Sequence, residues 1–162
     1  MPSPVRFLLP GLLAGTTLLL TNCSKSKDPE PPAAPTRVDL LTGHNWRLTA
    51  SSYAITENGA TNTRDTYATL LPCGRDNFVK FNRDYSYTHD NGPTKCDPAD
   101  LQILISSTWG LSANDTQLVF VPGSATALVY QIKTLDATTL SIERVVTTQA
   151  KTENYTYTYV AI

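Results

Sequence analysis

The sequence predicts an all-β domain, a small antiparallel up-and-down barrel of about eight strands, from three observations. Threonine and tyrosine, which favour strands, are frequent, and long runs of helix-forming residues are missing. Several segments alternate apolar and polar residues with a period of two, as half-buried strands do. Short polar turns separate these segments, so consecutive strands are expected to pair antiparallel.

The expected domain covers residues 37–162 and begins with one helical turn over Thr36–Leu41, for which Thr36 is a suitable N-cap. The first strand follows over 45–55, and its alternation places Trp46 and Ala50 on the same face. The polar segment Thr56–Asp65 carries an Asn-Gly turn signal and is expected to be a loop.

Seven further strands are expected after this loop. They lie over 77–82, 85–89, 103–111, 117–121, 128–135, 139–148 and 154–162. Eight such strands close well into a barrel, which removes exposed sheet edges. The alternative is a two-sheet β-sandwich, and the alternation of residues does not separate the two architectures.

Residues 1–22 are expected to be a signal peptide. Arg6 supplies a positive charge, and 7–20 is an uncharged, mostly apolar run that is too short for a comfortable membrane span. The sequence Leu20-Thr21-Asn22-Cys23 follows this run and resembles a bacterial lipobox. The resemblance implies cleavage before Cys23 and acylation of that cysteine, for example by palmitate. The alternative is an ordinary secretory signal that is cut nearby and leaves Cys23 as an unpaired thiol.

Residues 23–36 are expected to be the lipidated cysteine and a proline-rich tether. Prolines and alternating charges favour extended polyproline II, and its thirteen residues after Cys23 would span about 40 Å. By analogy with lipoprotein sorting, Ser24 after the cysteine implies anchoring in the outer membrane, with the domain facing the periplasm or the cell surface. The run Lys27–Glu30 weakly resembles surface-export signals.

The three cysteines are then accounted for. If Cys23 carries lipid, Cys73 and Cys96 remain as one pair in an oxidising compartment. Their disulfide would close a loop of about two dozen residues and contribute about 3 kcal/mol. The alternative is a zinc site, but no second nearby cysteine or histidine cluster supports one, and no metal or cofactor is expected.

Several short motifs resemble the lipocalin-like domain lipoproteins of Bacteroidota. They are Leu40-Leu41-Thr42-Gly43 with Trp46-Arg47-Leu48, Leu71-Pro72-Cys73, Phe81 to Tyr87, Lys95-Cys96-Asp97 and Thr108 to Ser112. The likeness covers about 40–162 and implies a fold and a location more than a function. One departure is Tyr85, which stands where the family usually has glycine; a positive φ there would cost tyrosine about 1 kcal/mol.

Aromatic residues on the expected strands are the candidate ligand-binding residues. They are Trp46, Phe81, Tyr87, Trp109, Tyr130, Tyr155, Tyr157 and Tyr159. If they point inward around a space, the barrel would bind one small apolar or amphipathic ligand. If they fill the interior, the chain is instead a structural or protein-interaction lipoprotein with a packed core and no ligand.

Enzymatic activity is not expected from the remaining polar residues. His89 lies beside Asp90, but no suitable serine or free thiol accompanies the pair, and His44 is expected to face water or backbone. Asp90, Asp97 and Asp100 share one loop and are expected to be solvated turn carboxylates rather than a calcium site. The net charge is −1, from 13 Lys and Arg against 14 Asp and Glu, so nucleic acid is not an expected partner.

Overall fold

The structure is a computed structural model that describes residues 32–121 and 126–162. The expected signal peptide, Cys23 and most of the expected tether lie outside the described residues. Ala34–Ile162 forms one compact unit that contains all the strands, the hydrophobic core and the disulfide. A unit with its own core is a domain in the physical sense.

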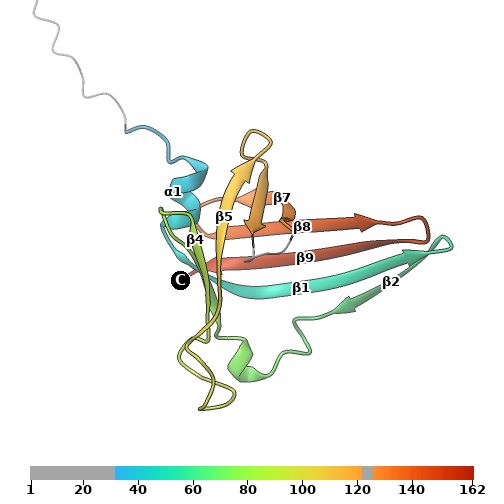
Figure 1. Cartoon of the computed structure of the whole chain (residues 1–162), viewed down its shortest axis with the longest axis horizontal. Coiled ribbons are helices and arrows are strands. Elements are labelled where there is room, and N and C mark those ends of the chain that lie inside the picture. Colours follow the sequence, from blue (N-terminus) through green and yellow to red (C-terminus); the bar gives the residue numbers. More distant parts are fainter. Residues whose placement is uncertain (1–31, 122–125) are drawn as a thin grey trace, which may run out of the picture. The chain divides into compact units, whose positions relative to one another are not determined.

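The described residues of this unit form one α-helix, a short 3-10 helix and nine strands (Figure 1). In chain order they are α1 (Arg37–Thr42), β1 (Asn45–Glu57), β2 (Ala60–Asp65), η1 (Pro72–Gly74), β3 (Phe78–Phe81), β4 (Ser86–Asp90), β5 (Ile103–Ser112), β6 (Gln117–Val121), β7 (Leu128–Leu135), β8 (Thr139–Thr147) and β9 (Lys151–Ala161). Within the described residues, no helix is long and apolar enough to cross a membrane.

The strands form a closed antiparallel barrel. The sheet order is β2-β1-β3-β4-β5-β6-β7-β8-β9, and β1 also pairs with β9 from Trp46↔Ala161 to Glu57↔Lys151. This last pairing closes eight strands into a ring, and β2 lies outside the ring as an extra strand. The predicted barrel is therefore confirmed, and the sandwich alternative is wrong.

The segment expected as a loop after β1 is instead a β-hairpin. β2 pairs with β1 from Ser52↔Asp65 to Glu57↔Ala60, around a turn in which Asn58 and Gly59 have φ values of 49° and 77°. Two residues of positive φ make the tight turn that Asn-Gly favours. All six residues of β2 are exposed, so the apolar alternation that reveals other strands is missing here.

A β-bulge corrects the predicted face of β1. The register between β1 and β9 shifts between Leu48 and Ala50. One extra residue reverses the alternation, so Trp46 and Ser51 are buried while Ala50 is exposed. Ala50 therefore does not share the face of Trp46, contrary to expectation.

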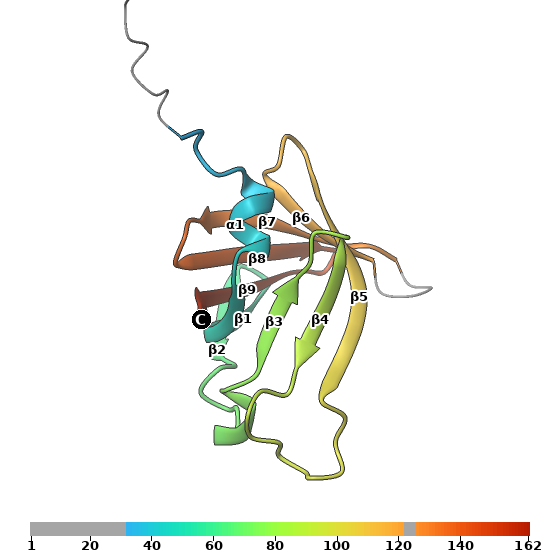
Figure 2. The same ribbon diagram turned by 90° about the vertical axis from the view of Figure 1, so that its left-hand side faces the viewer.

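The hydrophobic core gathers at the end of the barrel that α1 covers. Figure 2 shows α1 beside the strands, of which it contacts β3 and β7. Leu41 of α1 is fully buried, and its carbonyl oxygen accepts a 2.9 Å hydrogen bond from Nε1 of buried Trp46. Phe81, Leu118 and Leu140 fill the space beside them. This end of the barrel is therefore packed by its own side chains.

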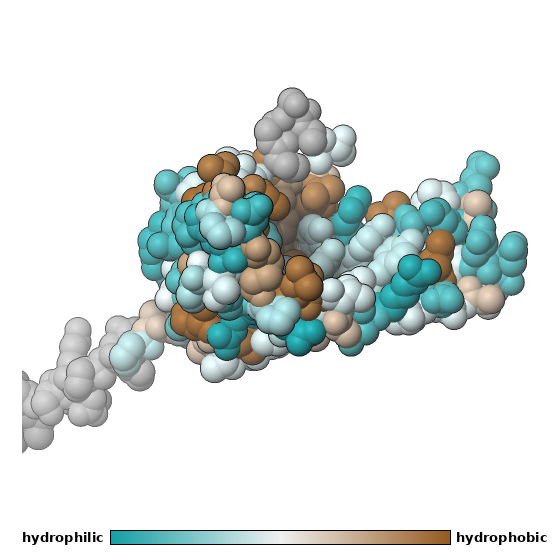
Figure 3. Space-filling view, turned by 90° about the horizontal axis from the view of Figure 1, so that it is seen from below, coloured by the Kyte–Doolittle hydropathy of each residue, from teal (hydrophilic) through white to brown (hydrophobic). Residues whose placement is uncertain are grey.

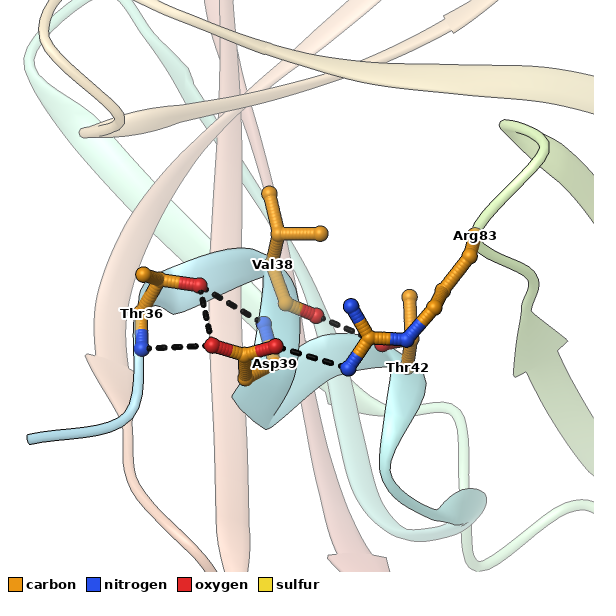
Figure 4. A network of polar contacts seen from close by, with 5 residues as sticks. All are labelled: Thr36, Val38, Asp39, Thr42 and Arg83. Carbon is orange, nitrogen blue, oxygen red and sulfur yellow. Dashed lines mark hydrogen bonds and ion pairs between the residues drawn. The ribbon is translucent and has the colours of Figure 1, made fainter. Parts of the chain in front are cut away.

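A polar network fixes α1 in place (Figure 4). The hydroxyl of Thr36 accepts from the backbone N–H of Asp39, and the Asp39 carboxylate accepts from the backbone N–H of Thr36 at 3.0 Å, which together form a capping box. Arg83, between β3 and β4, also donates to Asp39 at 2.7 Å. The helix is thus tied to the barrel it covers.

Cys73 and Cys96 form the predicted disulfide. Cys73 lies in η1, and Cys96 lies in the loop between β4 and β5. The bond therefore joins the connection between β2 and β3 to the connection between β4 and β5.

Candidate ligand-binding chamber

The barrel interior is not filled from end to end. A hollow of about 220 Å³, here the main hollow, is bounded by side chains from six consecutive strands, β4 to β9. Its lining is Tyr87, Ile105, Ser107, Phe120, Leu128, Tyr130, Ile142, Tyr157 and Tyr159. Because these strands run around the ring, the hollow lies inside the barrel.

Two further hollows adjoin the main one. The side hollow, of about 380 Å³, lies against β1 and β3 and shares Tyr87, Ile105, Tyr157 and Tyr159 with the main hollow. The mouth hollow, of about 490 Å³, is bordered by β1, β2 and β9 and shares Tyr157 with both. Because they share these lining residues, we describe the three hollows together as one chamber. Figure 3 shows the molecule hollowed beside the protruding strands.

The predicted ligand-binding residues fall into two groups. Five border the main or side hollow, namely Trp46, Tyr87, Tyr130, Tyr157 and Tyr159, and Tyr155 borders the mouth hollow. Phe81 and Trp109 are instead buried in the packed end, and neither borders these hollows. The three tyrosines of β9 share the inward face, as expected.

Aromatic rings form a continuous ladder from the packed end into the chamber. Ring centroids are 5.3 Å apart for Phe81 and Tyr87, and 4.8 Å apart for Tyr87 and Phe120. The ladder continues from Phe120 to Tyr130 at 5.6 Å and from Tyr130 to Tyr157 at 6.0 Å. The last three of these contacts are edge-on, a favourable arrangement that helps to hold the rings of the chamber wall in place.

The walls of the main and side hollows carry no charge at neutral pH, whereas Arg64 borders the mouth hollow. Burial raises the pKa of Tyr87, Tyr157 and Tyr159, so their hydroxyls stay protonated. Burial also lowers the pKa of His89, which borders the side hollow and is therefore neutral. Among the described residues, no hydrogen bond to the hydroxyls of these three tyrosines contributes to the shifts in their pKa values. They are available to a polar group of a ligand.

The other polar candidates do not assemble a site. The ring of His44 contacts Trp46 edge-on, with centroids 5.9 Å apart. Asp90 accepts from the backbone N–H of Gly92, while Asp97 and Asp100 accept from backbone N–H groups of their own loop. In the described ranges no three His, Cys, Asp or Glu residues lie together as metal ligands.

Sequence reasoning missed the aliphatic part of the wall. Ile105, Leu128 and Ile142 border the main hollow but are of no unusual residue type. Each occupies the apolar face of its strand, so the alternation alone could have placed them inside. Ile105 is 48% exposed although it points inward, which reflects the empty space beside it.

A small antiparallel barrel with one packed end and an apolar chamber defines a protein of the lipocalin-like class. A sequence model of the lipocalin-like domain family matches residues 41–142, which is well over half of the chain. The chain therefore belongs to the lipocalin-like domain family. The matched region runs from the end of α1 into β8, and β9 then closes the ring. No curated protein matches the chain.

Proposed function

We propose that this protein is a bacterial outer-membrane lipoprotein, of the type found in Bacteroidota, that holds one small apolar or amphipathic molecule in its barrel. The observation that carries the proposal is the unfilled interior. A barrel of eight strands is just wide enough to be filled by its own side chains or to hold one small ligand. Here the side chains leave the main and side hollows open.

The character of the wall sets the chemistry of the ligand. Of the nine residues around the main hollow, four have hydrocarbon side chains, four are tyrosines and one is a serine. Such a wall favours a ligand with an apolar body, because moving apolar surface from water into an apolar environment is favourable. The neutral hydroxyls of Tyr157 and Tyr159 add hydrogen-bonding groups for a polar end.

The proposed location rests on the N-terminal sequence. The apolar run 7–20 and Cys23 are arranged as in an exported lipoprotein. The Cys73–Cys96 disulfide supports export, because disulfides persist in oxidising compartments such as the periplasm. In this proposal the proline-rich residues 24–36 hold the barrel away from the membrane surface.

The alternative is an interaction module that needs no ligand. It would be favoured by exposed apolar residues at the start of β5, where Leu101 is 76% exposed and Leu104 is 44% exposed. It also requires a packed core, and the open hollows argue against that part. Binding of a molecule in the chamber is therefore the better supported function.

Native mass spectrometry tests the proposed binding. Residues 24–162 are purified from periplasm and from a lipid-rich extract, both as wild type and as Tyr157→Ala. We expect a discrete added mass on the wild type that Tyr157→Ala loses, because Tyr157 borders all three hollows. Tyr67→Ala is the matched control, since the Tyr67 ring lies under Arg75 and borders none of these hollows. An unmodified mass under both conditions would reject the proposal.

Metabolic labelling tests the proposed anchor separately. Cells that express the whole chain are fed a palmitate analogue, and the protein is isolated as wild type and as Cys23→Ser. We expect label on the wild type alone. Label that survives Cys23→Ser would show that the anchor has been assigned to the wrong residue.

A further inference from the structure

Four basic and aromatic residues form one row across the strands beside the chamber. The register places Arg144 of β8 opposite Tyr155 of β9, Tyr155 opposite Tyr53 of β1, and Tyr53 opposite Arg64 of β2. Residues directly opposite one another point to the same face of a sheet. This is the chamber face, because Tyr155, Tyr53 and Arg64 all border the mouth hollow.

Arg144 lies on the inward face of β8, next to residues that line the main hollow. It is half-buried, and it is two residues from Ile142, which borders that hollow. Burial raises the pKa of Tyr130, another lining residue, and the nearby guanidinium of Arg144 opposes this rise. The positive charge of Arg144 therefore reaches the chamber.

Tyrosine rings hold Arg144 in an orientation that suits anion binding. Its guanidinium carbon lies 5.8 Å from the centroid of the Tyr155 ring, and that ring lies 5.0 Å from the ring of Tyr53. A guanidinium over an aromatic face carries its five N–H groups at its edge. Part of that edge faces the hydroxyl of Tyr130, whose pKa a hydrogen bond from Arg144 lowers, and the rest of the edge is left for an anion. Those groups match the geometry of a carboxylate or a phosphate.

One carboxylate, that of Glu153, lies close to the row. Hydrogen bonds from Lys151 and Tyr53 lower its pKa most, and the charge of Arg144 lowers it further. Glu153, one row further out, is held by Lys151 at 2.7 Å and by the hydroxyl of Tyr53 at 2.7 Å. Glu57, at the tip of the hairpin, also lies opposite Lys151. In the described part of the chain, neither Arg144 nor Arg64 forms an ion pair.

We propose that the chamber takes an amphipathic anion whose carboxylate or phosphate head binds Arg144 while its apolar tail lies in the main hollow. This inference rests on the proposed binding function and adds the chemical class of the ligand. Arg64, at the other end of the row, supplies a second positive charge at the mouth that favours the approach of anions.

The test compares ligands that share one tail and differ in their heads. Decanoate, decyl phosphate and decanol are titrated into residues 24–162 by isothermal titration calorimetry, with the fold of each variant checked by circular dichroism. We expect at least one of the two anions to bind roughly tenfold tighter than decanol or more, because its head forms charge-assisted hydrogen bonds with Arg144. The anion that binds more tightly shows whether the site prefers a fatty-acid-like carboxylate head or a phospholipid-like phosphate head.

Variants connect this preference to Arg144. Arg144→Gln should lose the preference for anions and keep the affinity for decanol, and Arg144→Lys should keep part of the preference. Arg47→Gln, which removes an exposed arginine from the outer face of β1, should behave as wild type.

Three results would overturn the inference. Equal binding of decanol and both anions would reject the anionic head while leaving the proposed binding function in place. A preference for anions that survives Arg144→Gln would reject the role of Arg144. No binding of any of the three ligands would contradict both the inference and the proposed function.

Discussion

The indole Nε1 of Trp109 donates a 3.0 Å hydrogen bond to the carbonyl oxygen of Asn82. Asn82 begins the turn between β3 and β4, and the same turn holds Tyr85 at a φ of 63°. The Tyr85 ring lies 5.4 Å from the Trp109 ring, and the backbone N–H of Trp109 donates to the Tyr85 carbonyl oxygen. The Trp109 side chain and backbone thus secure a turn in which tyrosine adopts a conformation that favours glycine.

Substitutions at Tyr85 should separate backbone strain from ring packing. Tyr85→Ala removes the contact with Trp109 and keeps a side chain at positive φ, whereas Tyr85→Gly removes the contact and the strain together. We expect the glycine variant to be more stable than the alanine variant by about 1 kcal/mol, the reverse of the usual order in strands. Urea unfolding followed by tryptophan fluorescence measures the difference, and an alanine variant as stable as the glycine variant would contradict it.

The disulfide should be a major source of stability. Cys73 and Cys96 are 23 residues apart, so the bond restricts a long loop of the unfolded chain. The double variant Cys73→Ser/Cys96→Ser should lose about 3 kcal/mol of unfolding free energy. Reduced wild type is the control and should unfold at the same urea concentration as the double variant. Unchanged stability in both would show that the bond contributes nothing.

Two glycines of positive φ should respond differently to alanine. A Cβ at Gly92 would collide with the backbone carbonyl of Asp76, whereas a Cβ at Gly59 would meet open space. Both alanine variants should lose about 1 kcal/mol of stability because alanine disfavours a positive φ, and Gly92→Ala should lose more because of the collision. We expect Gly92→Ala to have the lower thermal midpoint, and equal midpoints would contradict the close approach of the two loops.

The capping network predicts a pH dependence at the low end of the scale. Hydrogen bonds from Thr36 and Arg83 lower the pKa of Asp39 from 3.8 to about 2. A lowered carboxyl pKa stabilises the fold above the ordinary value, and this stabilisation is lost as the pH falls from near 4 towards 2. Thermal midpoints of wild type and Asp39→Asn should therefore differ at neutral pH and converge as the pH approaches 2. A constant difference would show that the carboxylate charge is not involved.

The alternation of apolar and polar residues predicted most of the fold, because buried side chains recur every two residues in a half-buried strand. It failed where burial does not alternate. β2 has no buried residue. The bulge after Leu48 moves the later residues of β1 to the opposite face, and no unusual residue type in the sequence marks it. The Asn-Gly turn was visible in the sequence, but a turn signal alone does not show whether the following polar residues form a strand.

The site was less accessible from the sequence than the fold. The inward tyrosines of β9 could be predicted from their spacing, but whether a barrel is filled depends on how side chains from all strands meet at its centre. Phe81 and Trp109 pack at the closed end, while Tyr130 and Tyr157 border open space, although all four are aromatic residues on strands. The row from Arg144 to Arg64 depends on the register of four strands, which no single segment encodes.

The most direct test of the central claim is a methyl NMR titration of residues 24–162 with decanol or decanoate. If the chamber is the binding site, the methyl signals of Ile105, Leu128 and Ile142 should shift together, because these side chains border the main hollow. Signals of the exposed Leu101 and Val145 should stay in place. Shifts confined to the exposed residues, or no shifts with either ligand, would contradict a ligand-binding chamber.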